Sequence, residues 1–246
     1  MAKSIIRHDG RKPDDMRPVR ITRHFTSHAG GAVLIAFGRT RVLCTAMIEP
    51  GVPPWLAGKG RGWLTAEYAM LPSSTHSRKK RDSGKPDGRS VEIQRLVGRA
   101  LRGVVNLEKL GENTLWLDCD VLQADGGTCT AAITGAYVAL ADAVTAARRS
   151  GLLEENPLTG QIAAISVGLV NGRPVLDLDY PEDSNADADM NVAMLANGSL
   201  LDVQATGEKA AFTPRQLVRM LSMAITGIRQ LHQLQNRAIK SRSKAV

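Results

Sequence analysis

Apolar and polar residues alternate along four segments in the first third of the chain, with the period of two that β-strands require. β-branched residues are frequent in these segments, and a short Gly-Arg-Thr turn separates the middle two. The segments are RPVRITRHF (residues 17–25), GAVLIAF (31–37), RVLCTAMI (41–48) and GWLTAEYAML (62–71). Together they predict a meander of strands.

A helical period follows these strands. From Val91 to Val105 the apolar residues recur every three or four positions, which predicts an amphipathic helix with Ser90 as its N-cap. The polar face of this helix carries Arg95, Arg99 and Arg102. The helical period places these three guanidinium groups along one side.

A further strand and helix are predicted in the middle of the chain. TLWLDCDVL (residues 114–122) alternates like a half-buried strand, and an alanine-rich run over 129–149 predicts a central helix that is apolar almost all round. The turn QADGGT joins them, so its glycines and threonine stand at a helix N-terminus, where free backbone N–H groups favour an anion. Most Gly-Gly turns only satisfy backbone geometry, and the common nucleotide-binding motifs are absent from the sequence.

Two hairpin signals mark the second half of the chain. Asn171-Gly172 separates IAAISVGLV from PVLDLDY, and Asn197-Gly198 separates MNVAMLA from SLLDVQA. The chain then closes with a predicted helix. The predicted order of elements is strands, two helices, further strands and one helix. This order predicts an α+β fold.

The start of the last helix has a complete capping pattern. Thr213 is placed as the N-cap, Pro214 at the first helical position and Gln216 at the third, which is a capping-box arrangement. No internal repeat or linker divides the sequence, so one domain over residues 1–246 is the simplest organisation.

Composition fits a packed, soluble protein. Hydrophobic residues make up 43% and charged residues 23% of the 246 residues, which excludes a disordered chain. At 4%, aromatic residues are too few for a protein that stacks every base of a single strand. The three cysteines form no C-x-x-C pair, and no segment has the length and apolarity of a signal peptide or membrane span. We therefore expect a cytoplasmic protein that does not enter a membrane.

The net charge of +8 is distributed unevenly along the chain. Residues 73–89 hold six basic and two acidic residues, and we expect a flexible basic loop over about 73–88. Such a loop binds a polyphosphate backbone through counterion release or is simply a solvated surface, and both interpretations stay open. The basic end of the chain, about residues 237–246, is expected to fray.

Residues 177–189 have the opposite character, with six acidic residues and no basic residue. Clustered carboxylates repel one another, so a solvated acidic loop and a divalent-metal or general-acid site both remain open. Asp183 is expected in a loop. Asp189 lies where that loop enters an apolar strand, a position at which a rigid sheet supports a functional carboxylate.

Together these segments resemble the ribonuclease PH family of phosphorolytic 3′→5′ exoribonucleases and tRNA nucleotidyltransferases. The matching stretches keep the family's order across nearly the whole chain: RPVRITRHFTSHAGGAVLIAFGRTRVLCTA, GWLTAEYAMLP, GRSVEIQRLVGRALR, LDCDVLQADGGT with TAAITGA, and DLDYPEDSNADADMNV. The sequence is similar also to the core domains of polynucleotide phosphorylase and the archaeal exosome. The resemblance implies a single domain of two βαβα-like halves, a ribosomal-protein-type two-layer fold, and a homohexamer built as a trimer of dimers.

The resemblance also implies roles for individual residues. Arg89 together with Gly127 and Thr128 matches the family's phosphate-binding site. Asp183 and Asp189 match the catalytic carboxylates that hold Mg²⁺ and assist the leaving group. The arginines that match RNA-binding positions are Arg78 and Arg81 in the basic loop and Arg95 and Arg99 on the following helix.

Two positions depart from the family pattern. Cys129 stands where the family has a phosphate-binding arginine, and Ser73 stands where it commonly has an RNA-contacting arginine. Cysteine supplies neither the charge nor the fork of donors of an arginine. We therefore expect weakened binding of phosphate at position 129.

The activity implied is phosphate-dependent trimming of tRNA precursor 3′ ends, in which tRNA(n+1) and phosphate give tRNA(n) and a nucleoside diphosphate. Mg²⁺ is the expected cofactor, inorganic phosphate the co-substrate, and tRNA 3′ ends and other structured RNA the partners, with no role for DNA. Two alternatives remain. One is a hydrolytic metal nuclease that releases monophosphates, and the other is a non-catalytic RNA-binding ring subunit.

Overall fold

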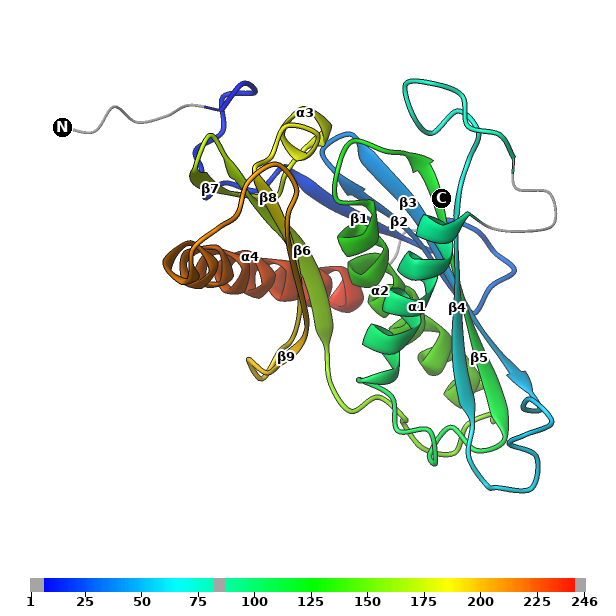
Figure 1. Ribbon diagram of the computed structural model, residues 1–246. Coiled ribbons are helices and arrows are strands. Elements are labelled where there is room, and N and C mark those ends of the chain that lie inside the picture. The colour runs from blue at the N-terminus through cyan, green and yellow to red at the C-terminus, as the bar shows by residue number, and fades with distance from the viewer. Residues whose placement is uncertain (1–6, 82–86, 242–246) are drawn as a thin grey trace.

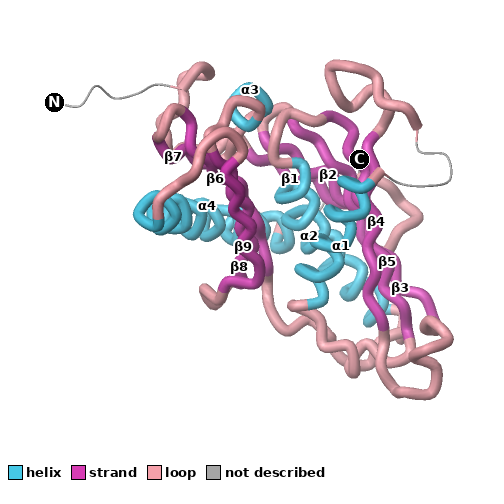
Figure 2. Tube along the Cα trace, in the orientation of Figure 1, coloured by secondary structure: helices cyan, strands magenta, loops and turns pink. Residues whose placement is uncertain are grey.

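Nine strands form two sheets in the part of the chain that the computed structural model describes, residues 7–81 and 87–241. Figure 1 shows helices α1 and α2 between the two groups of strands, and α4 behind the second group. The first half contains β1 (Val19–Arg23), β2 (Gly31–Phe37), β3 (Thr40–Pro50), β4 (Trp63–Met70), α1 (Gly88–Arg102), β5 (Asn113–Gln123) and α2 (Thr128–Arg149). The second half contains β6 (Ile162–Val170), β7 (Arg173–Leu176), α3 (Tyr180–Asp183), β8 (Ala188–Leu195), β9 (Leu200–Gly207) and α4 (Pro214–Lys240). The predicted α+β class and its two halves are confirmed, and Figure 2 shows how helices and strands are divided between them.

The first sheet has the strand order β1-β2-β3-β5-β4. The predicted meander is therefore wrong at its last step, because β5 and not β4 lies beside β3. The chain leaves β4, crosses through α1 and returns as β5 parallel to β4, which is the connection that parallel strands require. The inner position suits β5, since Leu115, Leu117, Cys119 and Val121 on its apolar face are all buried.

Helix α1 begins earlier than its apolar pattern predicts. Asp87, not Ser90, is the N-cap, and its side chain accepts a hydrogen bond from the backbone N–H of Ser90 at 2.7 Å. The apolar pattern reached Val105, but the helix ends at Arg102. Val105 is nevertheless buried, which explains why its spacing resembled that of the helical residues.

The second sheet has the order β7-β6-β8-β9, with every neighbouring pair antiparallel. Asn171 and Gly172 both have positive φ angles, 52° and 71°, as a two-residue turn between twisted strands requires. Ile162 to Leu169 of β6 are all buried, so helices or loops cover both faces of this strand.

Helix α2 lies at the centre of the molecule. By length and composition alone it could cross a membrane, but most of its residues are buried inside the fold. It approaches β2 so closely that a Cβ on Gly31 would lie 1.8 Å from the carbonyl oxygen of Ala139. Thr134 hydrogen-bonds both backbone groups of Ala164 in β6, at 3.0 and 3.1 Å. The helix therefore holds the two halves together.

Helix α4 has the predicted capping box of Thr213 and Gln216. We expected the chain to fray from about residue 237, but the helix continues to Lys240. Arg23 donates hydrogen bonds to the carbonyl oxygens of Ala238 and Ile239, at 2.9 and 3.0 Å, and so satisfies carbonyls that a helix end leaves free. The rest of the predicted tail, residues 242–246, lies outside the described part of the chain.

Candidate active site

A cleft of about 410 Å³ lies where the two halves meet. The loop after β4, the start of α1 and the β5–α2 turn line it from the first half, and β6, α3 and β8 line it from the second. Six residues singled out in the sequence meet in this cleft: Arg89, Gly127, Thr128, Cys129, Asp183 and Asp189. The predicted phosphate-binding and carboxylate positions, up to 100 residues apart in the sequence, are thus brought together.

The N-terminus of α2 opens into this cleft. Its N-cap, Gly127, has a left-handed backbone with φ of 65°, and no side chain of the described residues caps the first turn. The N–H groups of that turn are therefore available to an anion, which the positive end of the helix dipole also favours. Tyr68 is buried below the turn and donates a hydrogen bond to the Thr128 hydroxyl at 2.8 Å, and burial raises the pKa of its phenol.

Two side chains fix the turn before α2 from behind. Thr40 donates to the carbonyl oxygen of Gly126 at 2.7 Å and accepts from the N–H of Asp125 at 2.9 Å. Arg17 donates to the carbonyl oxygen of Asp125 at 2.5 Å. These hydrogen bonds occupy the carbonyl groups of Asp125 and Gly126 and so fix the turn. The N–H groups at the start of α2 are not used by these bonds.

Arg17 also binds the second half of the molecule. Its guanidinium donates to both carboxylate oxygens of Asp177, at 2.6 and 2.9 Å, and both side chains are almost fully buried. Burial alone would lower the pKa of Arg17, but the hydrogen bonds and charge of Asp177 raise it. Asp177 itself has a left-handed φ of 54°, a strained conformation that surrounding contacts must maintain. The ion pair joins the anion-binding turn to the segment that carries the carboxylates.

The acidic segment does not act as one group. Three of its six carboxylates are neutralised by arginines near the N-terminus: Arg7 donates to Glu182, Arg17 donates to Asp177, and Arg11 lies 3.6 Å from Asp179. Asp187 instead accepts a hydrogen bond from the N–H of Gly172 at 2.7 Å. The segment therefore does not form a single metal-binding cluster, and of its six carboxylates only those of Asp183 and Asp189 line the cleft.

Asp183 and Asp189 both line the cleft and have no salt-bridge partner among the described residues. Asp183 is the last residue of the short helix α3, not part of a loop as expected, because Asp179 forms a capping box with Glu182. Burial raises the pKa of Asp183, and burial together with the charge of Asp183 raises that of Asp189. One buried carboxylate oxygen of Asp189 has no hydrogen-bond partner among the described residues. These residues therefore fit a divalent cation, for which paired carboxylate oxygens are suitable ligands.

Arg89 and Cys129 complete the side of the cleft opposite the carboxylates. Arg89 is exposed in the first turn of α1, and its charge lowers the pKa of both Asp183 and Asp189 below what burial alone would produce. Cys129 is half-buried, and burial raises the pKa of its thiol to about 12. At neutral pH position 129 therefore presents a neutral thiol to the cleft.

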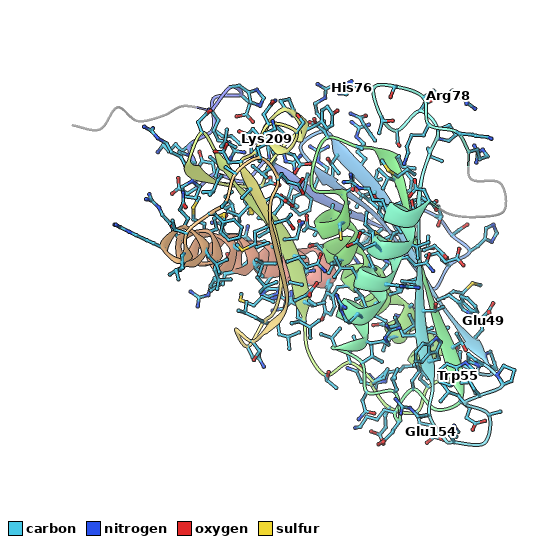
Figure 3. The ribbon with its side chains drawn as sticks, viewed as in Figure 1. Glu49, Trp55, His76, Arg78, Glu154 and Lys209 are labelled. Carbon is cyan, nitrogen blue, oxygen red and sulfur yellow. The ribbon has the colours of Figure 1, made fainter. Side chains whose placement is uncertain are left out.

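The four arginines predicted to bind RNA lie outside the lining of the cleft. Arg78 and Arg81 are exposed on the loop above it, where Figure 3 labels Arg78 beside His76. Arg95 and Arg99 are exposed on α1, and Arg99 lies 3.5 Å from Asp202. All four side chains are accessible to solvent, although Arg99 is paired with Asp202. Residues 82–86 of the basic loop lie outside the described part of the chain.

Several residues of the cleft were not assigned an individual role from the sequence. Lys79 lines it from the basic loop, and Ser166 and Asn191 lie opposite each other on β6 and β8. The Ser166 hydroxyl is buried and has no partner among the described residues. His76 crosses toward the second half, where its ring lies 5.6 Å from that of Tyr180. Only the tertiary fold places these side chains together.

Comparison with known families agrees with this division into two halves. The model of the 3′ exoribonuclease family, domain 1, matches residues 15–146, and that of domain 2 matches residues 160–227. The two matches cover most of the sequence in the order of the two sheets. The chain belongs to the 3′ exoribonuclease family.

Solved structures share the same fold over nearly all of the chain. Rice (Oryza sativa) Rrp46 has a TM-score of 0.78 at 19% identity, covering 95% of this chain and 100% of that one. The Archaeoglobus fulgidus exosome with RNA bound to the active site has a TM-score of 0.79 at 24% identity, with 92% and 91% covered. An archaeal exosome core has a TM-score of 0.73 at 22% identity, with 94% and 91% covered. At these identities the likeness establishes the fold.

Proposed function

We propose that this protein is a cytoplasmic phosphorolytic exoribonuclease that trims the 3′ ends of tRNA precursors. The observation that carries the proposal is the meeting of an uncapped helix N-terminus, Arg89 and the pair Asp183 and Asp189 in one cleft. This combination suits a reaction in which a phosphate anion attacks a phosphodiester, since such catalysis consists mainly of positioning and charge neutralisation. The exposed arginines around the cleft suit the backbone of a structured RNA.

The reaction exchanges one phosphorus–oxygen bond for another. An oxygen of inorganic phosphate attacks the phosphorus of the last phosphodiester, and the bond from that phosphorus to the 3′ oxygen of the preceding nucleotide breaks. A nucleoside diphosphate leaves, and the shortened RNA keeps a 3′-OH. Arg89 and the N–H groups at the start of α2 hold the attacking phosphate.

The carboxylates act on the leaving side of this reaction. One of the pair Asp183 and Asp189 protonates the departing 3′ oxygen, a role that its raised pKa favours. The pair would also hold Mg²⁺, which when bound supplies electrostatic stabilisation of the charge that develops in the transition state.

A phosphate titration with product analysis tests this function. We expect shortening of a tRNA with a 3′ extension to require inorganic phosphate and to release nucleoside diphosphates. Shortening that proceeds equally well without phosphate, with monophosphates as products, would identify a hydrolytic nuclease instead. RNA binding without any shortening would identify a non-catalytic ring subunit, the alternative that the neutral thiol of Cys129 favours.

Restoring a cation at position 129 is expected to strengthen phosphate binding. The variant Cys129→Arg should lower the KM for phosphate by about tenfold or more, because a hydrogen bond to a charged group contributes about 1.5–3 kcal/mol. Steady-state kinetics at saturating RNA measure this change. Cys129→Ser has a similar size but no charge, and its KM should stay near that of the wild type. An unchanged KM in Cys129→Arg would remove position 129 from the phosphate site.

We also propose assembly into a homohexameric ring, a trimer of dimers. Supporting this, large apolar side chains are exposed on the edge strand β9, where Leu200 and Val203 are 44% and 40% accessible, and on α4, where Val218 is 67% accessible. Edge strands and exposed apolar residues are common features of contacts between subunits. Light scattering across a dilution series measures the assembly, and a monomer at all concentrations would contradict it.

A further inference from the structure

The charges that line the cleft are closely balanced. Among the described residues that line it, Arg89 and Lys79 carry permanent positive charge, and Asp183 and Asp189 carry negative charge. An inorganic phosphate bound near two carboxylates needs compensating cations, since like charges a few ångströms apart repel strongly in a partly buried site. Arg89 and the helix dipole supply part of this compensation, which leaves the role of Lys79 to be explained.

Lys79 is held at the cleft by contacts of its backbone N–H and of its ammonium group. Its backbone N–H donates to the carbonyl oxygen of Pro72 at 2.8 Å, which closes the start of the basic loop. Its ammonium group donates to a carboxylate oxygen of Asp87 at 3.1 Å and lies 3.7 Å from the sulfur of Met70. Met70, at the end of β4, is itself part of the cleft wall.

The ammonium group of Lys79 is bonded to the residue that caps the helix carrying Arg89. Asp87 is the N-cap of α1, and its other carboxylate oxygen is occupied by the N–H of Ser90. Arg89 lies two residues further along, in the first turn of the same helix. Lys79 is therefore anchored to the N-cap of the helix that carries Arg89 in its first turn, and its side chain is 35% accessible.

We propose that Lys79 is the second cation of the phosphate site and contacts the inorganic phosphate that acts as nucleophile. This inference rests on the proposed phosphorolytic function and adds a residue to its site. The neutral thiol of Cys129 leaves the first turn of α2 without a charged side chain at that position. An ammonium from the loop after β4 supplies a charge-assisted hydrogen bond that the thiol cannot form.

The chain provides a matched control at the next residue. Lys80 is exposed on the same loop and does not line the cleft. Lys79→Gln and Lys80→Gln remove the same charge from the same loop, so they change long-range attraction for RNA equally. We expect Lys79→Gln to raise the KM for phosphate about tenfold at saturating RNA, toward the lower end of what a hydrogen bond to a charged group contributes. The change in Lys80→Gln should be less than about twofold.

A second arm tests whether Lys79 acts in place of a cation at position 129. In the Cys129→Arg background, Lys79→Gln should raise the phosphate KM by clearly less than in the wild-type background, because the two cations then share one anion. Equal effects in both backgrounds would show that the two positions act independently, and would overturn the assignment of Lys79 to the same phosphate.

Other outcomes separate this inference from the proposed function. If Lys79→Gln raises the KM for RNA at saturating phosphate but leaves the KM for phosphate unchanged, Lys79 binds the RNA backbone and the inference is wrong. Thermal stabilisation by inorganic phosphate alone gives a readout that does not depend on turnover. If Arg89→Gln abolishes that stabilisation and Lys79→Gln does not weaken it, the inference fails while the phosphate site stands. If phosphate stabilises neither the wild type nor any variant, both the inference and the proposed function fail.

Discussion

Asp189→Asn is expected to remove most of the activity while making the fold more stable. The variant loses a carboxylate that the proposed reaction uses, and a lost acid–base group lowers kcat by about 10²- to 10⁴-fold. Burial and the charge of Asp183 raise the pKa of Asp189, so the folded state disfavours the charged form that is present at neutral pH. Asparagine removes that penalty, so the Tm of the variant should be higher than that of the wild type. Phosphorolysis assays and thermal unfolding measure the two effects.

The pH dependence of this stability gain has a definite sign. As the pH falls through the raised folded pKa of Asp189, the wild type binds a proton more readily when folded than when unfolded, and its stability increases relative to neutral pH. The stability advantage of Asp189→Asn should therefore be present at neutral pH and shrink as the pH is lowered. Asp187→Asn is the control, because Asp187 does not line the cleft and an amide oxygen can still accept from Gly172. A loss of Tm in Asp189→Asn, or full activity, would contradict a functional carboxylate at this position.

The different roles of Asp187 and Asp189 within one acidic segment show why net charge alone could not identify the site. The sequence has six acidic residues over 177–189, and their spacing does not distinguish a structural carboxylate from a functional one. Their partners do: Asp177 and Glu182 are neutralised by buried arginines, whereas an oxygen of Asp189 has no partner among the described residues. A carboxylate oxygen kept buried without a partner has a cost in stability, which function explains better than packing does.

Local signals in the sequence were sufficient for much of the fold. The capping box at Thr213 and the turn at Asn171-Gly172 depend on neighbouring residues alone, and both were predicted correctly. The position of β5 between β3 and β4 depends on pairing between residues about 70 apart, for which the alternating pattern holds no information. The apolar pattern also predicted that α1 begins after Ser90, because the helical period begins there. The actual N-cap is Asp87, which lies outside that period.

Those residues of the site that belong to a recognisable sequence motif could be predicted. The turn before α2, Arg89 and the two aspartates could be named from the sequence, and the fold brings them together. The supporting residues could not be named in the same way. Tyr68 lies on β4 and Lys79 in a run of basic residues, and their contacts with Thr128 and Asp87 exist only after the sheet and α1 have formed.

Arg17→Met is expected to cause the largest loss of stability and to weaken phosphate binding as well. The variant removes the closest charged partner of the buried Asp177 and leaves only Arg11 at 3.7 Å and the backbone N–H of residue 17 at 2.8 Å among the described residues. Breaking a buried ion pair in this way costs about 3–5 kcal/mol. The turn before α2 also loses the donor to its Asp125 carbonyl group, so the N–H groups of the anion site lose their fixed orientation. We expect a lower Tm together with a raised KM for phosphate, measured by thermal unfolding and by steady-state kinetics at saturating RNA.

A second buried ion pair separates these two consequences. Arg23 donates to both carboxylate oxygens of Asp142, at 2.5 and 2.9 Å, in a part of the fold that does not line the cleft. Arg23→Met should lower Tm to a similar degree but leave the phosphate KM unchanged. Adding Asp177→Asn to Arg17→Met removes the buried charge, so the double variant should regain part of the lost stability while its phosphate KM stays high. If Arg17→Met behaves like Arg23→Met in both measurements, Arg17 supports the fold and does not position the anion-binding turn.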